Sequence, residues 1–119
     1  MRILIAENQP KVRFALRLLL EQQPEVERVG EARDAEELIA QLKIFCPDLV
    51  LIAWELTGPP AVDALPLVRR TCPETAVIAL SGRPETRQVC LAAGADGFVC
   101  KCDPPDKLLA AISDHSQRQ

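Results

Sequence analysis

Short apolar runs alternate along the chain with longer stretches in which apolar residues recur every three or four positions. The runs are typical of buried β-strands, and the recurring spacing is typical of amphipathic helices. The predicted strands are residues 2–6, 26–31, 48–54, 76–80 and 97–101. The predicted helices are residues 9–22, 34–45, 63–71 and 85–93, with a last helix that follows 103–106 and ends near 113.

This strict alternation of strands and helices predicts an α/β fold built on a parallel sheet. Residues 49–53 are apolar at every position, which indicates a strand covered on both faces. The short chain and right-handed crossovers favour a doubly wound, flavodoxin-like sheet of five strands, order 2-1-3-4-5, with helices on both faces. We expect one domain over residues 1–114, and a frayed tail or the start of a linker over 115–119, which includes His115.

Capping residues and prolines refine the helix ends. Pro10 suits the first turn of its helix, where a missing N–H costs little. Asp34 opens the second helix, and Glu37 three residues later completes a capping-box pattern. Gly94 is a good residue to end the fourth helix. Pro66 is tolerable only if it falls in the first turn of the third helix.

Composition narrows the classes of partner. Hydrophobic residues make up 48% of the chain, which suits a globular domain and excludes a disordered one. The net charge of −3 argues against direct binding to nucleic acid or to anionic membranes. No apolar run approaches the roughly 20 residues that cross a bilayer. A cytoplasmic location without a membrane partner is therefore expected.

The five cysteines are expected to be reduced thiols, because their number is odd and their spacing matches no disulfide framework. Cys100 and Cys102 would share one face of a strand, but two thiolates leave a tetrahedral zinc site two ligands short. Nothing in the sequence places Cys46 near Cys72. We therefore predict free thiols and no metal site.

Polar side chains lie at the predicted strand ends. Glu7 and Asn8 follow the first strand, Ala53 and Trp54 lie at the end of the third, and Ser81 and Lys101 lie at the ends of the fourth and fifth. In a doubly wound sheet, ligands bind beyond the carboxyl ends of the strands where the strand order reverses. A carboxylate, an amide, a hydroxyl and an ammonium should thus converge around the Ala53 methyl. Lys101 needs a partner there, and we predict that it reaches Glu7 or a strand-end carbonyl.

Two segments carry a resemblance to a known family. Pro-Asp-Leu-Val-Leu at 47–51 precedes position 53, and Ala-Gly-Ala-Asp-Gly-Phe at 93–98 precedes Lys101. Together with the apolar strands at 2–6 and 77–81, these two segments match a known pattern. The chain resembles receiver domains of bacterial two-component response regulators over essentially its whole length. It is most similar to the subgroup that precedes a LuxR-type DNA-binding domain.

The resemblance implies roles for the strand-end residues. In that family an aspartate at the end of the third strand takes a phosphoryl group from phosphohistidine, and an acidic pair binds Mg²⁺. Matched by position, the resemblance implies that Ser81 and Lys101 supply the hydroxyl and the ammonium that contact the phosphoryl group, and that Phe98 is the switch aromatic. Glu7 retains one carboxylate of the acidic pocket. Asn8 replaces the second acid with an amide, and Ala53 replaces the nucleophile with a methyl.

The departures from the family pattern decide the expected chemistry. An alanine methyl at position 53 cannot form an acyl phosphate. Mg²⁺ prefers carboxylate oxygens, so the loss of acids at positions 8 and 53 predicts weak or absent Mg²⁺ binding and no cofactor. Two origins of Ala53 stay open: natural loss, or engineering of a normal receiver. Asn8 favours natural loss, because abolishing phosphorylation by design needs only one change.

The sequence therefore predicts a pseudo-receiver, not an enzyme, that signals by protein contact or dimerisation. By resemblance, the contact face comprises the fourth helix, fifth strand and fifth helix, and a C-terminal DNA-binding output domain would lie outside this chain. One alternative is phosphorylation of another residue, such as Glu55 or Ser81. Another is a flavodoxin-like cofactor binder, which is disfavoured because no phosphate-binding loop follows the first strand.

Plainer interpretations of the same residues also remain. Glu7 would be a surface carboxylate, Asn8 a helix N-cap, Ser81 a turn residue, Lys101 an edge lysine, Phe98 a core residue, and Trp54 a stacking platform or a packing residue.

Overall fold

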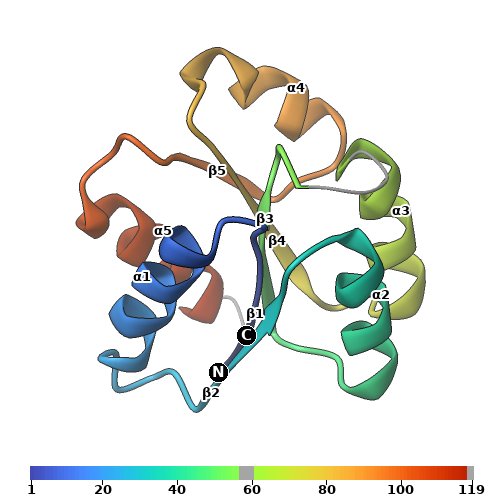
Figure 1. The fold of residues 1–119 in the computed structure, drawn as a ribbon, viewed down its shortest axis with the longest axis horizontal. Coiled ribbons are helices and arrows are strands. Elements are labelled where there is room, and N and C mark those ends of the chain that lie inside the picture. The colour runs from blue at the N-terminus through green and yellow to red at the C-terminus, as the bar shows by residue number, and fades with distance from the viewer. Residues whose placement is uncertain (57–60, 118–119) are drawn as a thin grey trace.

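The computed structural model describes residues 1–56 and 61–117, which form a parallel sheet with helices on both faces (Figure 1). The strands are β1 (Arg2–Ala6), β2 (Arg28–Ala32), β3 (Leu49–Ala53), β4 (Ala76–Ser81) and β5 (Gly97–Cys100). The helices are α1 (Pro10–Glu21), α2 (Ala35–Ile44), α3 (Ala61–Thr71), α4 (Arg87–Ala92) and α5 (Pro105–Gln117), with a 3₁₀ turn η1 (Pro84–Thr86) before α4.

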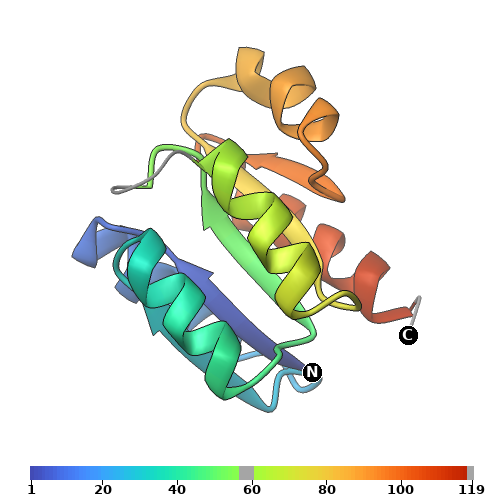
Figure 2. The same ribbon diagram turned by 90° about the vertical axis from the view of Figure 1, so that its right-hand side faces the viewer.

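The five strands are all parallel and lie in the order β2-β1-β3-β4-β5, which confirms the predicted doubly wound topology. The strand order reverses between β1 and β3. Figure 1 shows α1 and α5 on one side of the sheet and α2 and α3 on the other. The 90° view in Figure 2 shows α2 and α3 side by side across the sheet, with α4 beyond them.

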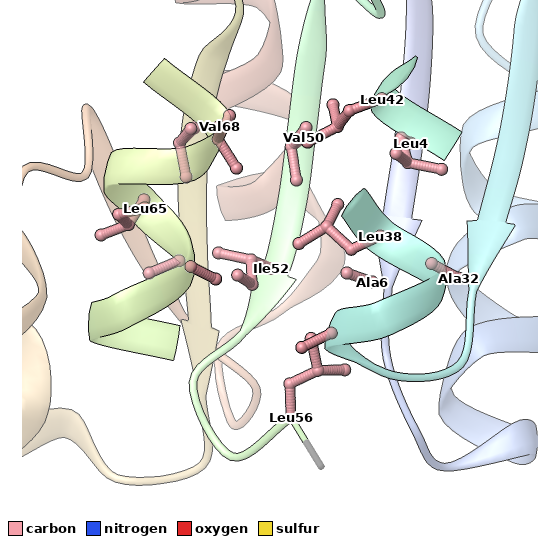
Figure 3. Packing of buried hydrophobic residues seen from close by; sticks show 14 of the residues in the cluster. Leu4, Ala6, Ala32, Leu38, Leu42, Val50, Ile52, Leu56, Leu65 and Val68 are labelled. Atoms are coloured by element: carbon pink, nitrogen blue, oxygen red, sulfur yellow. The ribbon is translucent and has the colours of Figure 1, made fainter. Parts of the chain in front are cut away.

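Alternation along the strands divides the core into two layers. In β1, Leu4 and Ala6 belong to the layer beneath α2 and α3, whereas Ile3 and Ile5 belong to the layer beneath α1 and α5. Figure 3 shows the first layer, in which Leu38 of α2 lies close to the β-strands. β3 is buried at every position, as its uninterrupted apolar sequence predicts.

The cap predicted for α2 is present. The Asp34 carboxylate accepts a hydrogen bond of 2.8 Å from the Glu37 N–H. The Glu37 carboxylate turns back to the backbone N–H of Arg33, at 2.7 Å, instead of to that of the cap residue. Hydrogen bonds from the Arg33 guanidinium and its backbone lower the pKa of the Glu37 carboxyl. Gly94 follows α4 with a φ of 112°, the left-handed conformation expected of a C-terminal glycine.

Three expectations about element ends were wrong. α3 begins at Ala61, so Pro66 lies beyond the first turn, at an exposed position of the helix. α5 continues to Gln117, and His115, which we expected in a frayed tail, is buried beside Gly97 of β5. β5 ends at Cys100 because the chain turns at Lys101 and Cys102.

The cysteines also correct an expectation. The structure joins Cys46 to Cys72 and Cys100 to Cys102 in disulfides, and leaves Cys90 as a buried free thiol. Cys46 and Cys72 meet because each follows the C-terminal end of a helix, and α2 and α3 run side by side. The Cα atoms of that pair are 5.6 Å apart. Among the described residues, no helix has the length and apolar character needed to cross a membrane.

Candidate functional site

The carboxyl ends of β1, β3, β4 and β5 bring the predicted site residues to one edge of the sheet. The strand register pairs Ala6 with Ile52, Ala53 with Leu80, and Ser81 with Cys100. Glu7 and Lys101 directly follow β1 and β5. Their convergence is therefore a consequence of parallel topology, and it occurs beside the β1/β3 switch point.

Glu7 and Lys101 form an ion pair across this edge. The Lys101 Nζ lies 2.8 Å from Oε2 of Glu7, whose side chain is 1% exposed. This confirms the prediction that Lys101 reaches toward Glu7. Oε1 accepts a hydrogen bond of 3.2 Å from the Gln9 N–H. Oε2 has no aligned hydrogen bond within the described residues, so its contact with Lys101 is electrostatic and balances a buried negative charge.

The Ser81 hydroxyl is held by a second carboxylate. Ser81 is fully buried, and its Oγ donates a hydrogen bond of 2.7 Å to Oε1 of Glu55. The same Oγ accepts from the Arg83 N–H at 3.1 Å. Glu55 lies in a turn that begins at Ala53. In this turn the Leu56 N–H donates a hydrogen bond of 3.1 Å to the Ala53 carbonyl, so Glu55 lies past the end of β3. Both bonding directions of the hydroxyl are thus in use.

Glu55 was predicted only as an alternative phosphate acceptor, and its hydrogen bond with Ser81 was not predicted. No periodic pattern identifies that contact, because it depends on the path of the turn after β3. The strand ends are themselves tied together, since the Lys101 N–H donates to the Ser81 carbonyl at 2.8 Å. The two carboxylates therefore hold the ammonium and the hydroxyl in two pairs, Glu7 with Lys101 and Glu55 with Ser81.

Ala53 lies at the last position of β3 and is fully buried. Its methyl offers no polar atom to the surrounding groups. Trp54 donates its backbone N–H to the Leu80 carbonyl at 2.7 Å, and its side chain packs against the core layer beneath α2 and α3. Packing, and not an open stacking platform, accounts for Trp54.

Asn8 and Phe98 complete the predicted set. The N-cap of α1 is Gln9, which makes no side-chain capping bond, so the interpretation of Asn8 as the cap was wrong. Asn8 is half-buried between β1 and α1. Phe98 is half-buried against the same core layer as Trp54, and the Arg87 guanidinium lies 5.9 Å from its ring centroid. Such a distance is within the range of a cation–π contact.

A metal requires donors that the described residues do not bring together here. Across residues 1–56 and 61–117, no group of three or more His, Cys, Asp or Glu residues is arranged to hold a metal ion. At the strand ends, Glu7 is already paired with Lys101, Glu55 with Ser81, and position 53 carries a methyl. At this edge, one ion pair and one hydroxyl–carboxylate hydrogen bond lie around the methyl of Ala53.

Comparisons with known proteins agree with this architecture. A family described as "Response regulator receiver domain" matches residues 3–113. The nitrate/nitrite response regulator protein NarL of Escherichia coli (strain K12) is 29% identical over 112 residues, which cover 92% of this chain and 52% of NarL. The chain therefore spans about half the length of this relative.

Solved structures show the same fold. The two-component response regulator RcsB in complex with DNA superimposes with a TM-score of 0.90 at 25% identity, over 100% of this chain and 61% of that one. A LuxR-family two-component response regulator from Aurantimonas sp. SI85-9A1 gives a TM-score of 0.86 at 29% identity, over 95% and 82% of the two chains.

Proposed function

The chain belongs to the response regulator receiver domain family of two-component signalling, and on that premise we propose that it is a pseudo-receiver. It acts by contacting a protein partner or a second copy of itself, without phosphorylation at position 53 and without catalysis. Position 53 takes the place of the family's phosphate acceptor, and Glu7, Asn8, Ser81, Phe98 and Lys101 occupy the positions of its acidic pocket and switch residues.

One observation carries the proposal: the two groups that would contact a phosphoryl group are already paired within the chain. Lys101 lies on Glu7 at 2.8 Å, and Ser81 donates to Glu55 at 2.7 Å. Between them, the Ala53 methyl cannot accept a phosphoryl group. An incoming phosphoryl group would have to displace two carboxylates and would form no bond to the chain at position 53.

Mg²⁺, which the family uses, does not fit the donors present. A hard cation of this kind takes carboxylate oxygens in an octahedral arrangement. Oε2 of Glu7 faces an ammonium, Asn8 offers a neutral amide, and Ala53 offers no oxygen. The residues therefore support a receiver that works without the metal.

The contact between Ser81 and Glu55 favours one second candidate, in which Ser81 is itself phosphorylated. A hydroxyl nucleophile requires a base, and the Glu55 carboxylate lies at hydrogen-bonding distance from it. The Ser81 oxygen would then bond to phosphorus, the P–O bond to the phosphodonor would break and release the donor group (acetate from acetyl phosphate), and Glu55 would accept the hydroxyl proton. The donor set counts against this candidate, because the described residues do not fit Mg²⁺ and Lys101 is already paired with Glu7, which leaves the incoming phosphoryl charge poorly neutralised.

Both candidates are tested by incubating the chain with acetyl phosphate and Mg²⁺ and measuring its intact mass, while Trp54 fluorescence is followed. The pseudo-receiver should gain no mass. A stoichiometric gain of one phosphoryl group would refute it. The chemistry of the adduct then identifies the acceptor, because an acyl phosphate on Glu55 hydrolyses in mild alkali and a phosphoserine does not. Ser81→Ala provides the matched control.

Repair variants test the metal argument separately. Ala53→Asp alone should restore phosphorylation poorly, because only one of the two missing acids returns. Ala53→Asp combined with Asn8→Asp should be phosphorylated faster, and Asn8→Asp alone should remain inert. Equal rates for the single and double repair would show that the acid at position 8 is not needed for the metal.

The proposed contact face comprises α4, β5 and α5. On α4, Val89 is 57% exposed and Leu91 is 40% exposed, whereas Cys90 between them is buried. Exposed apolar side chains on a short helix are consistent with a surface that another protein covers. Val89→Lys should weaken self-association or partner binding in sedimentation velocity. Ile44→Lys, at a 77% exposed position at the end of α2, is the matched control and should have no effect.

The wider protein is proposed from its relatives. Since the chain spans about half of NarL, a C-terminal output domain would lie outside it, and DNA binding would belong to that domain. The net charge of −3 supports a receiver that makes no nucleic-acid contact of its own. A bacterial cytoplasmic location completes the proposal.

A further inference from the structure

Cys100 and Cys102 flank Lys101, and the end of β5 brings them together. In a continuing strand, residues two apart point the same way but remain separated along the strand. Here β5 ends at Cys100, and the turn at 101–102 folds the chain back. The Cα atoms of the two cysteines are 5.2 Å apart, within the roughly 4.4–6.8 Å range of disulfides. The structure accordingly joins them.

The turn that presents the two sulfurs is held by hydrogen bonds that do not depend on the disulfide. The Lys101 N–H donates to the Ser81 carbonyl at 2.8 Å, and the Asp103 N–H donates to the Cys100 carbonyl at 2.9 Å. The Cys100 N–H in turn donates to the Asp103 carboxylate at 3.2 Å. The reduced and oxidised forms can therefore share one backbone arrangement, so oxidation needs no refolding.

The two cysteines differ in access. Cys100 is 5% exposed, whereas Cys102 is exposed on the turn. An external disulfide can reach Cys102 first, and Cys100 then lies close enough to displace it. This is the arrangement of an attacking and a resolving thiol.

A surface hollow of about 540 Å³ between α1 and α5 adjoins the pair, and Cys100 is part of its wall. Its remaining wall is mainly apolar, with two lysines, Lys11 and Lys101, and one acid, Asp103. Lys101 is already paired with Glu7, so Lys11 is the wall lysine that can meet a carboxylate of a small peptide disulfide, a group that a neutral disulfide lacks.

We propose that Cys100 and Cys102 form a thiol–disulfide exchange site for low-molecular-mass disulfides of the glutathione class. The Cys102 thiolate attacks one sulfur of the external disulfide, forms a mixed disulfide and releases the first thiolate. The Cys100 thiolate then attacks the Cys102 sulfur, the bond to the external group breaks, and the second thiolate leaves. Two electrons pass to the external disulfide, and the two protons of the pair end on the released thiols.

Oxidation closes a covalent ring across Lys101, the residue that pairs with buried Glu7. The disulfide therefore adds a covalent restraint to the backbone arrangement that both redox forms share, at the residue that pairs with Glu7. The exchange site does not depend on whether position 53 is silent, so failure of one proposal leaves the other intact.

The test uses the chain carrying Cys46→Ser and Cys72→Ser, which retains Cys90, Cys100 and Cys102. The reduced protein is incubated with glutathione disulfide, quenched in acid, and analysed by intact mass and by peptide mapping without reductant. We expect the loss of two hydrogens and a fall in free thiols from three to one. Trypsin cleavage after Lys101 should leave two peptides joined by the new bond. A stable glutathione adduct, or no change in mass, would overturn the proposal.

Single substitutions in that background separate the roles of the two thiols. Cys100→Ser should accumulate a stable adduct on Cys102, because the resolving thiol is gone. Cys102→Ser should react with glutathione disulfide roughly tenfold more slowly than the parent, because the remaining cysteine of the pair, Cys100, is buried. Equal rates for Cys102→Ser and the parent would refute the assignment of Cys102 as the attacking thiol.

The class of ligand is tested at Lys11, which lies in the wall of the hollow and away from the sulfur chemistry. Lys11→Gln should slow the reaction with glutathione disulfide by about threefold at low salt and leave the reaction with neutral 2-hydroxyethyl disulfide unchanged. Lys43→Gln, at an exposed position of α2, is the matched charge control. An equal effect of Lys11→Gln on both disulfides would refute the glutathione class.

Discussion

The pair formed by Glu7 and Lys101 makes the sharpest stability prediction. Lys101→Met removes the ammonium and leaves a carboxylate that is 1% exposed without its ion-pair partner. Breaking a buried pair from one side typically costs about 3–5 kcal/mol, because the remaining charge stays desolvated. Two features of this site reduce that cost: the Lys101 side chain is 24% exposed, and the Gln9 N–H still reaches Oε1.

We therefore expect Lys101→Met to lower the free energy of unfolding by about 2–3 kcal/mol, less than is typical for fully buried pairs. With a urea slope of about 1.5 kcal/mol per molar for a domain of this size, the midpoint should fall by roughly 1.3–2 M. Circular dichroism in urea measures the shift. Lys107→Met, at an exposed position of α5, should change the free energy by no more than about 0.5 kcal/mol.

The double variant Glu7→Gln with Lys101→Met decides the cause. Replacing both charges removes the uncompensated carboxylate, so its free energy of unfolding should return to within about 1 kcal/mol of the starting protein. The coupling between the two positions should then be about 1–2 kcal/mol in a double-mutant cycle. A double variant as unstable as the sum of the single changes would mean that packing, and not the buried charge, accounts for the loss.

Three further predictions concern local features. Asp34→Ala should lower the free energy of unfolding by about 1 kcal/mol, because the hydrogen bond to the Glu37 N–H is lost. Chemical denaturation measures this loss, and an unchanged free energy would show that the cap is dispensable. Gly94→Ala should lower the free energy of unfolding by at least about 1 kcal/mol in the same assay, because a φ of 112° is strained for a residue with a Cβ. An unchanged free energy would contradict that backbone conformation. Burial raises the pKa of the Cys90 thiol, so alkylation at pH 8 should be at least roughly tenfold slower in the folded chain than in urea; equal rates would show that Cys90 is accessible.

The site was predicted as far as parallel topology determines it. Once the sheet order is known, the residues that follow β1, β3, β4 and β5 must meet at one edge. The meeting of Glu7 and Lys101 follows from that rule and from the need of a buried charge for a partner. The position of Ala53 between them follows from the same rule.

The contact between Glu55 and Ser81 was not predictable in this way. It depends on a turn after β3 that returns a carboxylate toward the neighbouring strand end, and turn paths carry no periodic signal. The cysteine pairs have the same origin. Cys46 meets Cys72 because two helices run side by side and end together, and Cys100 meets Cys102 because β5 ends at Cys100, one residue earlier than its apolar pattern suggests.

Local chemistry along the chain determined the order of the strands and helices, the two-sided burial of β3 and the absence of a nucleophile at position 53. These properties are set by periodicity, by side-chain type and by the limited topologies open to alternating strands and helices. Tertiary structure decided which polar groups are paired, which cysteines meet, and that His115 of α5 is buried beside β5. Those outcomes depend on contacts between residues far apart in sequence, and their energies appear only when the sheet and both helical layers are assembled.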